Sequence, residues 1–129
     1  MNEVAIKSAD TAAKLIFSNI EGDYFTASFE SPELRTSRRV WGYTDCEFLV
    51  NLFEYMAKEW KGWEGEQTWT SIEGEFGLSC SSDRQGHVRI KLFFVQFEGM
   101  EPWKAEPTLN LEAGLMDEIA KNMHKFFLG

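Results

Sequence analysis

Apolar and polar residues alternate along the first forty positions of the chain, and this pattern predicts a series of β-strands. In residues 23–30, Phe25, Ala27 and Phe29 alternate with Tyr, Thr and Ser side chains. A period of two is typical of a strand that buries one face. Shorter stretches, bounded by turn residues, predict three further strands at 4–8, 12–18 and 34–41.

The next segment, residues 44–61, changes from a period of two to the spacing of an amphipathic helix. Its apolar positions fall on one face and are Phe48, Leu49, Leu52, Phe53, Met56 and Trp60. Thr44 and Glu47 have the spacing of a capping box at its start, and Gly62 suits its end. A second helix closes the chain, with an apolar face made of Leu115, Met116, Ile119, Ala120, Met123, Phe126 and Phe127.

Between the two helices the pattern predicts four more strands, at residues 67–73, 75–81, 87–97 and 103–111. Pro107 restricts the last of them to a sheet edge, because proline donates no ladder hydrogen bond. In the 87–97 strand the second face also becomes apolar, at Phe93, Val95 and Phe97. We therefore expect this second face to be covered or to contact a partner.

The predicted elements follow the order ββββ-α-ββββ-α, which defines the fold class as α+β. Strands in consecutive runs with short turns favour antiparallel pairing over parallel crossovers. We expect an antiparallel sheet of about six to eight strands with both helices packed on one face. The length of 129 residues fits a single domain over residues 1–129.

The composition supports a folded, acidic domain. Hydrophobic residues make up 43% of the chain and aromatic residues 15%, enough apolar surface to disfavour disorder. The formal net charge of −8 argues against nucleic acid and anionic membranes as partners, because both attract clustered Lys and Arg. The charge is compatible with a basic protein partner and with solubility alone.

The expected location is the cytoplasm. The first ten residues lack the pattern of a signal peptide, and no window approaches the roughly 20 apolar residues that a membrane span needs. Cys46 and Cys80 have no CxxC spacing, and we expect both to be reduced and buried.

Sequence signatures of catalysis and metal binding are missing. The chain has no GxSxG, glycine-rich phosphate loop or HExxH motif, and its only histidines are His87 and His124. We expect no catalytic residue, no metal and no cofactor. Four glutamates cluster in sequence and are expected to face water, although a hard cation could also sit among them; they are Glu64, Glu66, Glu73 and Glu75.

The most unusual segment contains three tryptophans within ten residues, Trp60, Trp63 and Trp69, interleaved with Gly and Glu. Such a segment can form an aromatic surface that binds a sugar, a cationic peptide or a methylated amine. It can equally supply core side chains, as large aromatics in small domains usually do. Under the second interpretation Trp63 is mostly buried and Glu66 is exposed.

The segments WKGWEGEQTW, SIEGEFGLSCSSDRQGHVRIKL and LEAGLM resemble a domain-of-unknown-function family of small bacterial proteins. The resemblance covers about residues 22–128, and its motifs are W-x-G-W-x-G, E-G-E, G-H-V and L-E-A-G-x-L. It implies no established activity. In size and charge the family is similar to the immunity proteins of bacterial toxin systems.

Three functions agree with this sequence. The leading hypothesis is a non-enzymatic protein-binding module of the immunity type, whose binding residues are Trp60, Trp63, Glu64, Glu66, Trp69, Glu73 and Glu75. An alternative is a small carbohydrate-active or hydrolytic protein that uses a Glu pair beside the tryptophans. The third is a homodimer with Phe93, Val95 and Phe97 at its interface.

Overall fold

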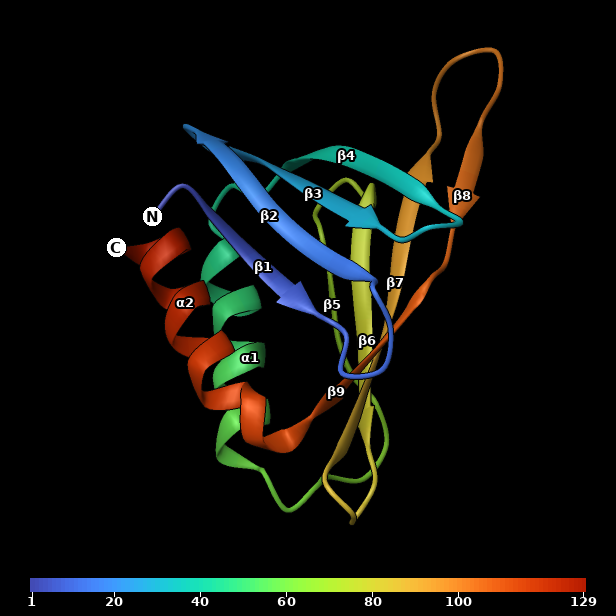
Figure 1. The fold of residues 1–129 in the computed structure, drawn as a ribbon. Coiled ribbons are helices and arrows are strands. Elements are labelled where there is room, and N and C mark those ends of the chain that lie inside the picture. Colours follow the sequence, from blue (N-terminus) through green and yellow to red (C-terminus); the bar gives the residue numbers. More distant parts are fainter.

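A computed structural model describes residues 1–129 (Figure 1). The elements in chain order are β1 (Glu3–Lys7), β2 (Lys14–Glu21), β3 (Tyr24–Glu30), β4 (Arg35–Trp41), α1 (Cys46–Lys58), β5 (Gln67–Thr70), β6 (Phe76–Ser82), β7 (His87–Gln96), β8 (Trp103–Ala105), β9 (Thr108–Glu112), the 3-10 turn η1 (Ala113–Leu115) and α2 (Met116–Leu128). The α+β class and the predicted order of strand and helix blocks are confirmed, with the last predicted strand present as two pieces. No helix is long and apolar enough to cross a membrane.

The strands form two antiparallel sheets instead of one continuous sheet. β1 to β4 pair in sequence order, and β5, β6 and β7 form the second sheet, with β8 and β9 along the free edge of β7. The inward positions of both sheets are buried, as are those of the helices. Two short helices cannot cover so much apolar strand surface, so the sheets bury much of it against each other.

The helix pair closes one side of the space between the sheets. α1 and α2 contact each other; α1 also contacts the edge strand β5, and α2 contacts the edge strand β1. On the opposite side β4 of the first sheet contacts β7 of the second. Figure 1 shows the first sheet lying across the second with both helices along one flank. The helix pair therefore closes the interior beside β1 and β5, and Phe127 of α2 packs on Phe17 and Phe25 of the first sheet's inner face.

Pro107 interrupts an edge strand, as the sequence predicts. β9 and β8 pair with β7 in one continuous register, from His87 opposite Glu112 to Gln96 opposite Trp103. At the break, the Leu92 N–H donates to the Pro107 carbonyl at 2.8 Å. Proline offers no N–H in return, so one ladder hydrogen bond to β7 is missing at this break in the edge strand.

The start of α1 differs from the predicted capping box. The helix begins at Cys46; Asp45 takes the cap position with helical backbone angles, and no side chain caps the helix. Tyr43 adopts a positive φ of 45°, and the N–H groups of Gly42 and Tyr43 both donate to the Asp23 carbonyl. The β2–β3 turn thus determines where the chain enters the helix, and Thr44 is displaced from the cap position.

The centre of the core is an aromatic cluster that joins both sheets to α2. The Phe17 ring on β2 lies 5.9 Å from Phe25 on β3, 5.9 Å from Phe76 on β6 and 5.6 Å from Phe127 on α2, measured between centroids. All three contacts are edge-to-face, the arrangement that aromatic pairs favour. Phe17 is fully buried.

Truncation of Phe17 should be among the most destabilising single changes in the chain. Phe17→Ala removes a ring that contacts both sheets and α2, and should lower the free energy of unfolding by about 3–5 kcal/mol. The control is Phe48→Ala, because Phe48 is 61% exposed and should change stability by no more than about 0.5 kcal/mol. Chemical denaturation measures the free energy of unfolding of both variants. Equal decreases would contradict the central position of Phe17 in the core.

Candidate functional site

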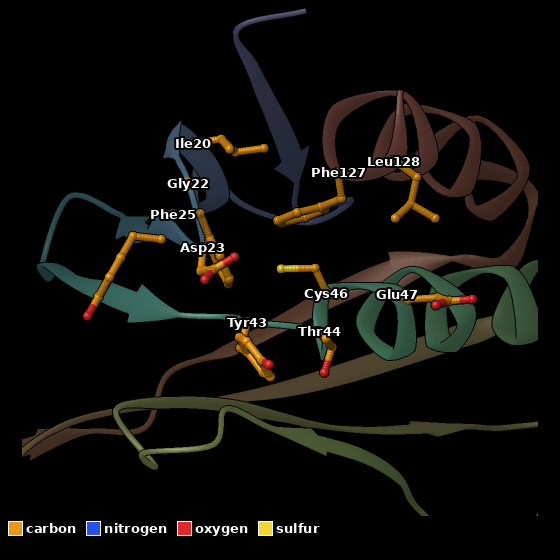
Figure 2. Close-up of a pocket in the computed structure, with 11 residues that line it drawn as sticks. Ile20, Gly22, Asp23, Phe25, Tyr43, Thr44, Cys46, Glu47, Phe127 and Leu128 are labelled. Carbon is orange, nitrogen blue, oxygen red and sulfur yellow. The ribbon is translucent and has the colours of Figure 1, made fainter.

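An apolar hollow lies beside the start of α1, and we call it the α1 pocket (Figure 2). Its volume is about 280 Å³. The β2–β3 turn, the segment that leads into α1 and the end of α2 contribute its lining, which consists of Ile20, Gly22, Asp23, Tyr24, Phe25, Tyr43, Thr44, Cys46, Glu47, Phe127 and Leu128. It is therefore built from segments far apart in the sequence.

The inner wall of the α1 pocket is continuous with the core. Phe25 and Phe127 pack edge-to-face with centroids 5.0 Å apart, and Figure 2 shows the Cys46 sulfur directed into the space between them. Gly42 makes this packing feasible. A Cβ at position 42 would lie 2.4 Å from Cys46 Sγ and 3.2 Å from the Phe25 ring.

The rim of the α1 pocket is apolar and negatively charged. Ile20, Tyr24, Tyr43 and Leu128 are large apolar side chains that stay exposed; Tyr43 reaches 56%. The only charged residues in the lining are Asp23 and Glu47, and neither carboxylate takes part in an ion pair or a side-chain hydrogen bond. The pocket thus combines an aromatic wall with uncompensated negative charge.

The thiol in the α1 pocket is a poor nucleophile. Burial raises the pKa of Cys46 to about 11, and the nearby Asp45 and Asp23 carboxylates act in the same direction. The thiol is therefore protonated at neutral pH, whereas cysteine nucleophiles require the thiolate. No histidine lines the pocket to act as a base. These features favour binding over covalent catalysis at this site.

Both histidines lie against carboxylates elsewhere on the surface. His87 Nδ1 is 2.8 Å from Asp83 Oδ2, and this hydrogen bond raises the pKa of His87. The backbone N–H of His87 is the largest cause that lowers the pKa of Asp83. His124 Nδ1 is 3.2 Å from Glu54 Oε1. Neither imidazole hydrogen-bonds a Ser, Thr or Cys side chain.

The three tryptophans of the Trp60–Trp69 segment have three different environments. Trp69 lies in the core and donates from Nε1 to the Asp45 carbonyl. Trp63 is half-buried against the core; its backbone N–H donates to Ser82 Oγ and its Nε1 to the Cys80 carbonyl. Trp60 is 59% exposed. The three rings therefore do not share one exposed face, and Trp60 is the most exposed of them.

The four predicted glutamates separate into two pairs at opposite ends of β5. Glu64 and Glu66 precede the strand and are exposed. Glu73 and Glu75 follow it; Glu73 is exposed, whereas Glu75 is buried and accepts a hydrogen bond from the Ser71 hydroxyl. The pair formed by Glu73 and Glu75 thus lies away from Trp60 and Trp63. No three His, Cys, Asp or Glu side chains group closely enough to hold a metal ion.

The predicted interface residues lie on the outward face of β7. Phe93 and Val95 are half-buried, and Phe97, just beyond the strand, is 62% exposed. Lys91 Nζ lies 5.4 Å from the centroid of the Phe93 ring. The Phe97 ring lies over Gly74, where an added Cβ would be 3.4 Å away. Phe97 is thus a surface residue.

No pattern in the sequence marks the α1 pocket. Its rim residues occupy a hairpin turn, a loop and a helix end, and no shared spacing connects them. Among the lining residues, only Tyr43 has a local sequence signal, because it is an aromatic residue that follows a glycine and precedes the start of a helix. In the structure the centroid of the Tyr43 ring lies 5.5 Å from that of Trp41.

A comparison with known protein families identifies the family of this chain, and that family has no assigned activity. The chain belongs to a family of unknown function (DUF6228), whose profile matches residues 6–129. This confirms the resemblance to a domain-of-unknown-function family. No curated protein matches the chain.

Trp63→Ala should destabilise the protein more than Trp60→Ala. Trp63 packs against the core and its indole Nε1–H donates to the Cys80 carbonyl, so loss of this side chain should cost about 2–3 kcal/mol. Trp60→Ala should change the free energy of unfolding by about 0.5 kcal/mol or less, because its ring is largely in water. Thermal and chemical denaturation give both values. Similar losses of stability in the two variants would show that Trp63 does not pack against the core.

Cys46 should react slowly with alkylating reagents near neutral pH. A pKa raised from 9.0 to about 11 lowers the thiolate fraction at pH 7 about a hundredfold. In a Cys80→Ala background, the rate of iodoacetamide modification should rise about tenfold per pH unit between pH 7 and 9. Mass spectrometry follows the reaction, with denatured protein as the control. A native rate at pH 7 equal to the denatured rate would contradict the raised pKa.

Proposed function

We propose that this chain is a non-enzymatic protein-binding module of the immunity type, which holds an apolar side chain of a basic partner protein in its α1 pocket. The observation that carries the proposal is the pocket itself, an aromatic wall with an exposed apolar rim and two uncompensated carboxylates, Asp23 and Glu47. Large buried anchors supply most of the energy of protein interfaces. A partner that presents an apolar side chain flanked by Lys or Arg satisfies both features.

The charge of the whole chain supports the same class of partner. The net charge of −8 steers a basic protein toward the chain, and the carboxylates at the rim orient it as it arrives. The protonated Cys46 thiol and the absence of a histidine from the pocket agree with a non-enzymatic role. Cys46 and Cys80 are both free, which suits a reducing compartment, and we place the interaction in the cytoplasm.

A second surface near Trp60, Glu64 and Glu66 offers the same chemistry in a weaker form. Trp60 is exposed, and Lys61 Nζ lies 5.3 Å from its ring centroid. Glu64 and Glu66 form no ion pairs. None of these three residues lines one of the five main hollows, so this surface ranks behind the α1 pocket and serves as the comparison in the experiment.

The test retrieves the partner with wild-type protein and compares matched variants at the two surfaces. Asp23→Asn with Glu47→Gln removes the charge of the α1 pocket and keeps its shape, and Glu64→Gln with Glu66→Gln does the same beside Trp60. Tyr43→Ala and Trp60→Ala form the matched aromatic pair. Bait proteins recover partners from a lysate of the native host, and association rates are then measured with the recovered protein at low and high salt.

The α1-pocket charge variant should associate about tenfold more slowly at low salt, with a smaller difference at high salt, because salt screens the attraction. Tyr43→Ala should speed dissociation. The variants near Trp60 should behave as wild type. If binding to the recovered partner weakens only in the variants near Trp60, the interface lies on that surface instead of the α1 pocket. Failure of wild-type bait to retain any basic protein would reject the proposed function.

A homodimer is the second candidate, favoured by the exposure of Phe97 beside Phe93 and Val95. These three side chains make an apolar strip on the outward face of the second sheet. Light scattering at micromolar concentration should then report a mass of two chains for the wild type. Phe97→Ser should reduce the measured mass to that of one chain. A single-chain mass for the wild type would exclude this interface.

A further inference from the structure

β8 and β9 form the free edge of the second sheet, and no further strand pairs with them (Figure 1). Two hydrogen bonds show which backbone groups of this edge face outward. The Pro107 carbonyl accepts from the Leu92 N–H on β7 and therefore faces β7. The Asn110 carbonyl accepts from the Ala9 N–H in the β1–β2 loop and therefore faces away from β7. Because the direction of these groups alternates along a strand, the even-numbered residues of the edge face outward.

The outward backbone groups of Lys104, Glu106 and Thr108 have no hydrogen-bond partner in the backbone. An edge with free N–H and C=O groups can pair with an added strand. Pro107 does not block such pairing, because the N–H that proline lacks would lie on the β7 side. The β1–β2 loop, which bonds the Asn110 carbonyl, ends the open stretch after Thr108.

A hollow of about 470 Å³ lies beside this open stretch, and we call it the edge hollow. Pro107 and Thr108 line it from the edge, and Pro32 and Leu34 line it from the turn between β3 and β4. Phe29 on β3 also lines it, and only 3% of this residue is exposed. Leu34 is a large apolar side chain that stays exposed. The edge hollow thus places apolar side chains next to backbone groups that lack partners.

Side chains of the odd-numbered residues on this edge point toward the first sheet. Leu109 and Leu111 are buried in the core, and Pro107 continues their face because the period of a strand is two residues. In an added strand, the residue opposite Pro107 directs its side chain to the same face. That side chain therefore enters the edge hollow beside Phe29 and Leu34.

We propose that this edge binds an extended peptide segment of another protein, which adds to β8 and β9 as an antiparallel strand. Peptide residues opposite Glu106 and Thr108 exchange backbone hydrogen bonds with them. The residue between these two, opposite Pro107, carries an apolar side chain that fills the edge hollow. Backbone pairing supplies the affinity of such complexes, and the side-chain pocket supplies the preference for sequence.

A peptide fits this edge better than a second copy of the chain. The open stretch offers three outward residues, and self-pairing over so short a length cannot reach the roughly 800 Å² that a stable dimer buries on each partner. Such a contact would also not offset the repulsion between two chains that each carry a net charge of −8. A neutral peptide meets no such repulsion.

The test is an NMR titration of the chain with N-acetylated, C-amidated pentapeptides of serine and threonine, whose central residue is Ala, Val, Leu or Phe. The reporters are the backbone N–H signals of Lys104, Glu106 and Thr108. At least one peptide with a central Val, Leu or Phe should shift the reporters in a saturable way. It should bind about tenfold more tightly than the Ala peptide, because its larger side chain fills the edge hollow.

N-methylation of the best peptide separates backbone pairing from other contacts. Methyl groups on its second and fourth nitrogens remove the N–H groups that donate to the Thr108 and Glu106 carbonyls, and should weaken binding about tenfold or more. Methyl groups on the first and fifth nitrogens are the matched control. Those N–H groups face away from the edge, so this peptide should keep the affinity of the parent.

Two variants of the chain test the same pairing from the other side. Glu106→Pro removes one outward N–H of the edge and should weaken binding about tenfold. Glu106→Ala is the matched control, because both variants lose the ion pair with Lys91 but Glu106→Ala keeps the N–H and should bind as wild type. If Glu106→Pro does not fold, the two methylated peptides decide the result.

The absence of a saturable shift with every peptide would overturn the proposal, and so would equal losses from the two methylation patterns or from the two Glu106 variants. If hydrogen exchange of the reporter N–H groups in the free chain slows as the protein concentration rises, the edge pairs with a second copy and the proposal is wrong. The result is independent of the proposed partner at the α1 pocket. Tyr43→Ala, which changes that pocket, should bind the peptides as wild type does.

Discussion

Contact between the two sheets through Phe17 and its aromatic neighbours is the interaction on which the remaining structure depends. Phe17 on β2 meets Phe76 on β6 across the interior, and both helices then close the side where β1 and β5 are unpaired. Neither sheet could bury its apolar face alone. Because Phe127 of α2 packs on Phe17, the same cluster also anchors the C-terminal helix.

This core extends directly into the α1 pocket. Phe25 and Phe127 belong to the aromatic cluster and also form the inner wall of the pocket, so a ligand there would rest on rigid groups. Preorganised surfaces lose little conformational entropy on binding.

Local sequence signals succeeded where one residue determines local geometry and failed where distant residues compete for it. Pro107 predicted an edge strand because a missing N–H has the same consequence in any sheet. Thr44 and Glu47 predicted a capping box that does not form, because hydrogen bonds from Gly42 and Tyr43 to the Asp23 carbonyl set the chain direction instead. The tryptophan spacing likewise gave no indication that Trp69 and Trp60 would have opposite environments.

The α+β class, the order of elements and the apolar faces of strands and helices follow from the sequence alone, because each depends on periodicity within one segment. The division into two sheets and the α1 pocket were decided only by the tertiary structure. Each of these requires segments far apart in the chain to meet, as Phe25 meets Phe127 and Arg38 meets Gln96. Such meetings depend on how whole faces pack together, a property that no local pattern encodes.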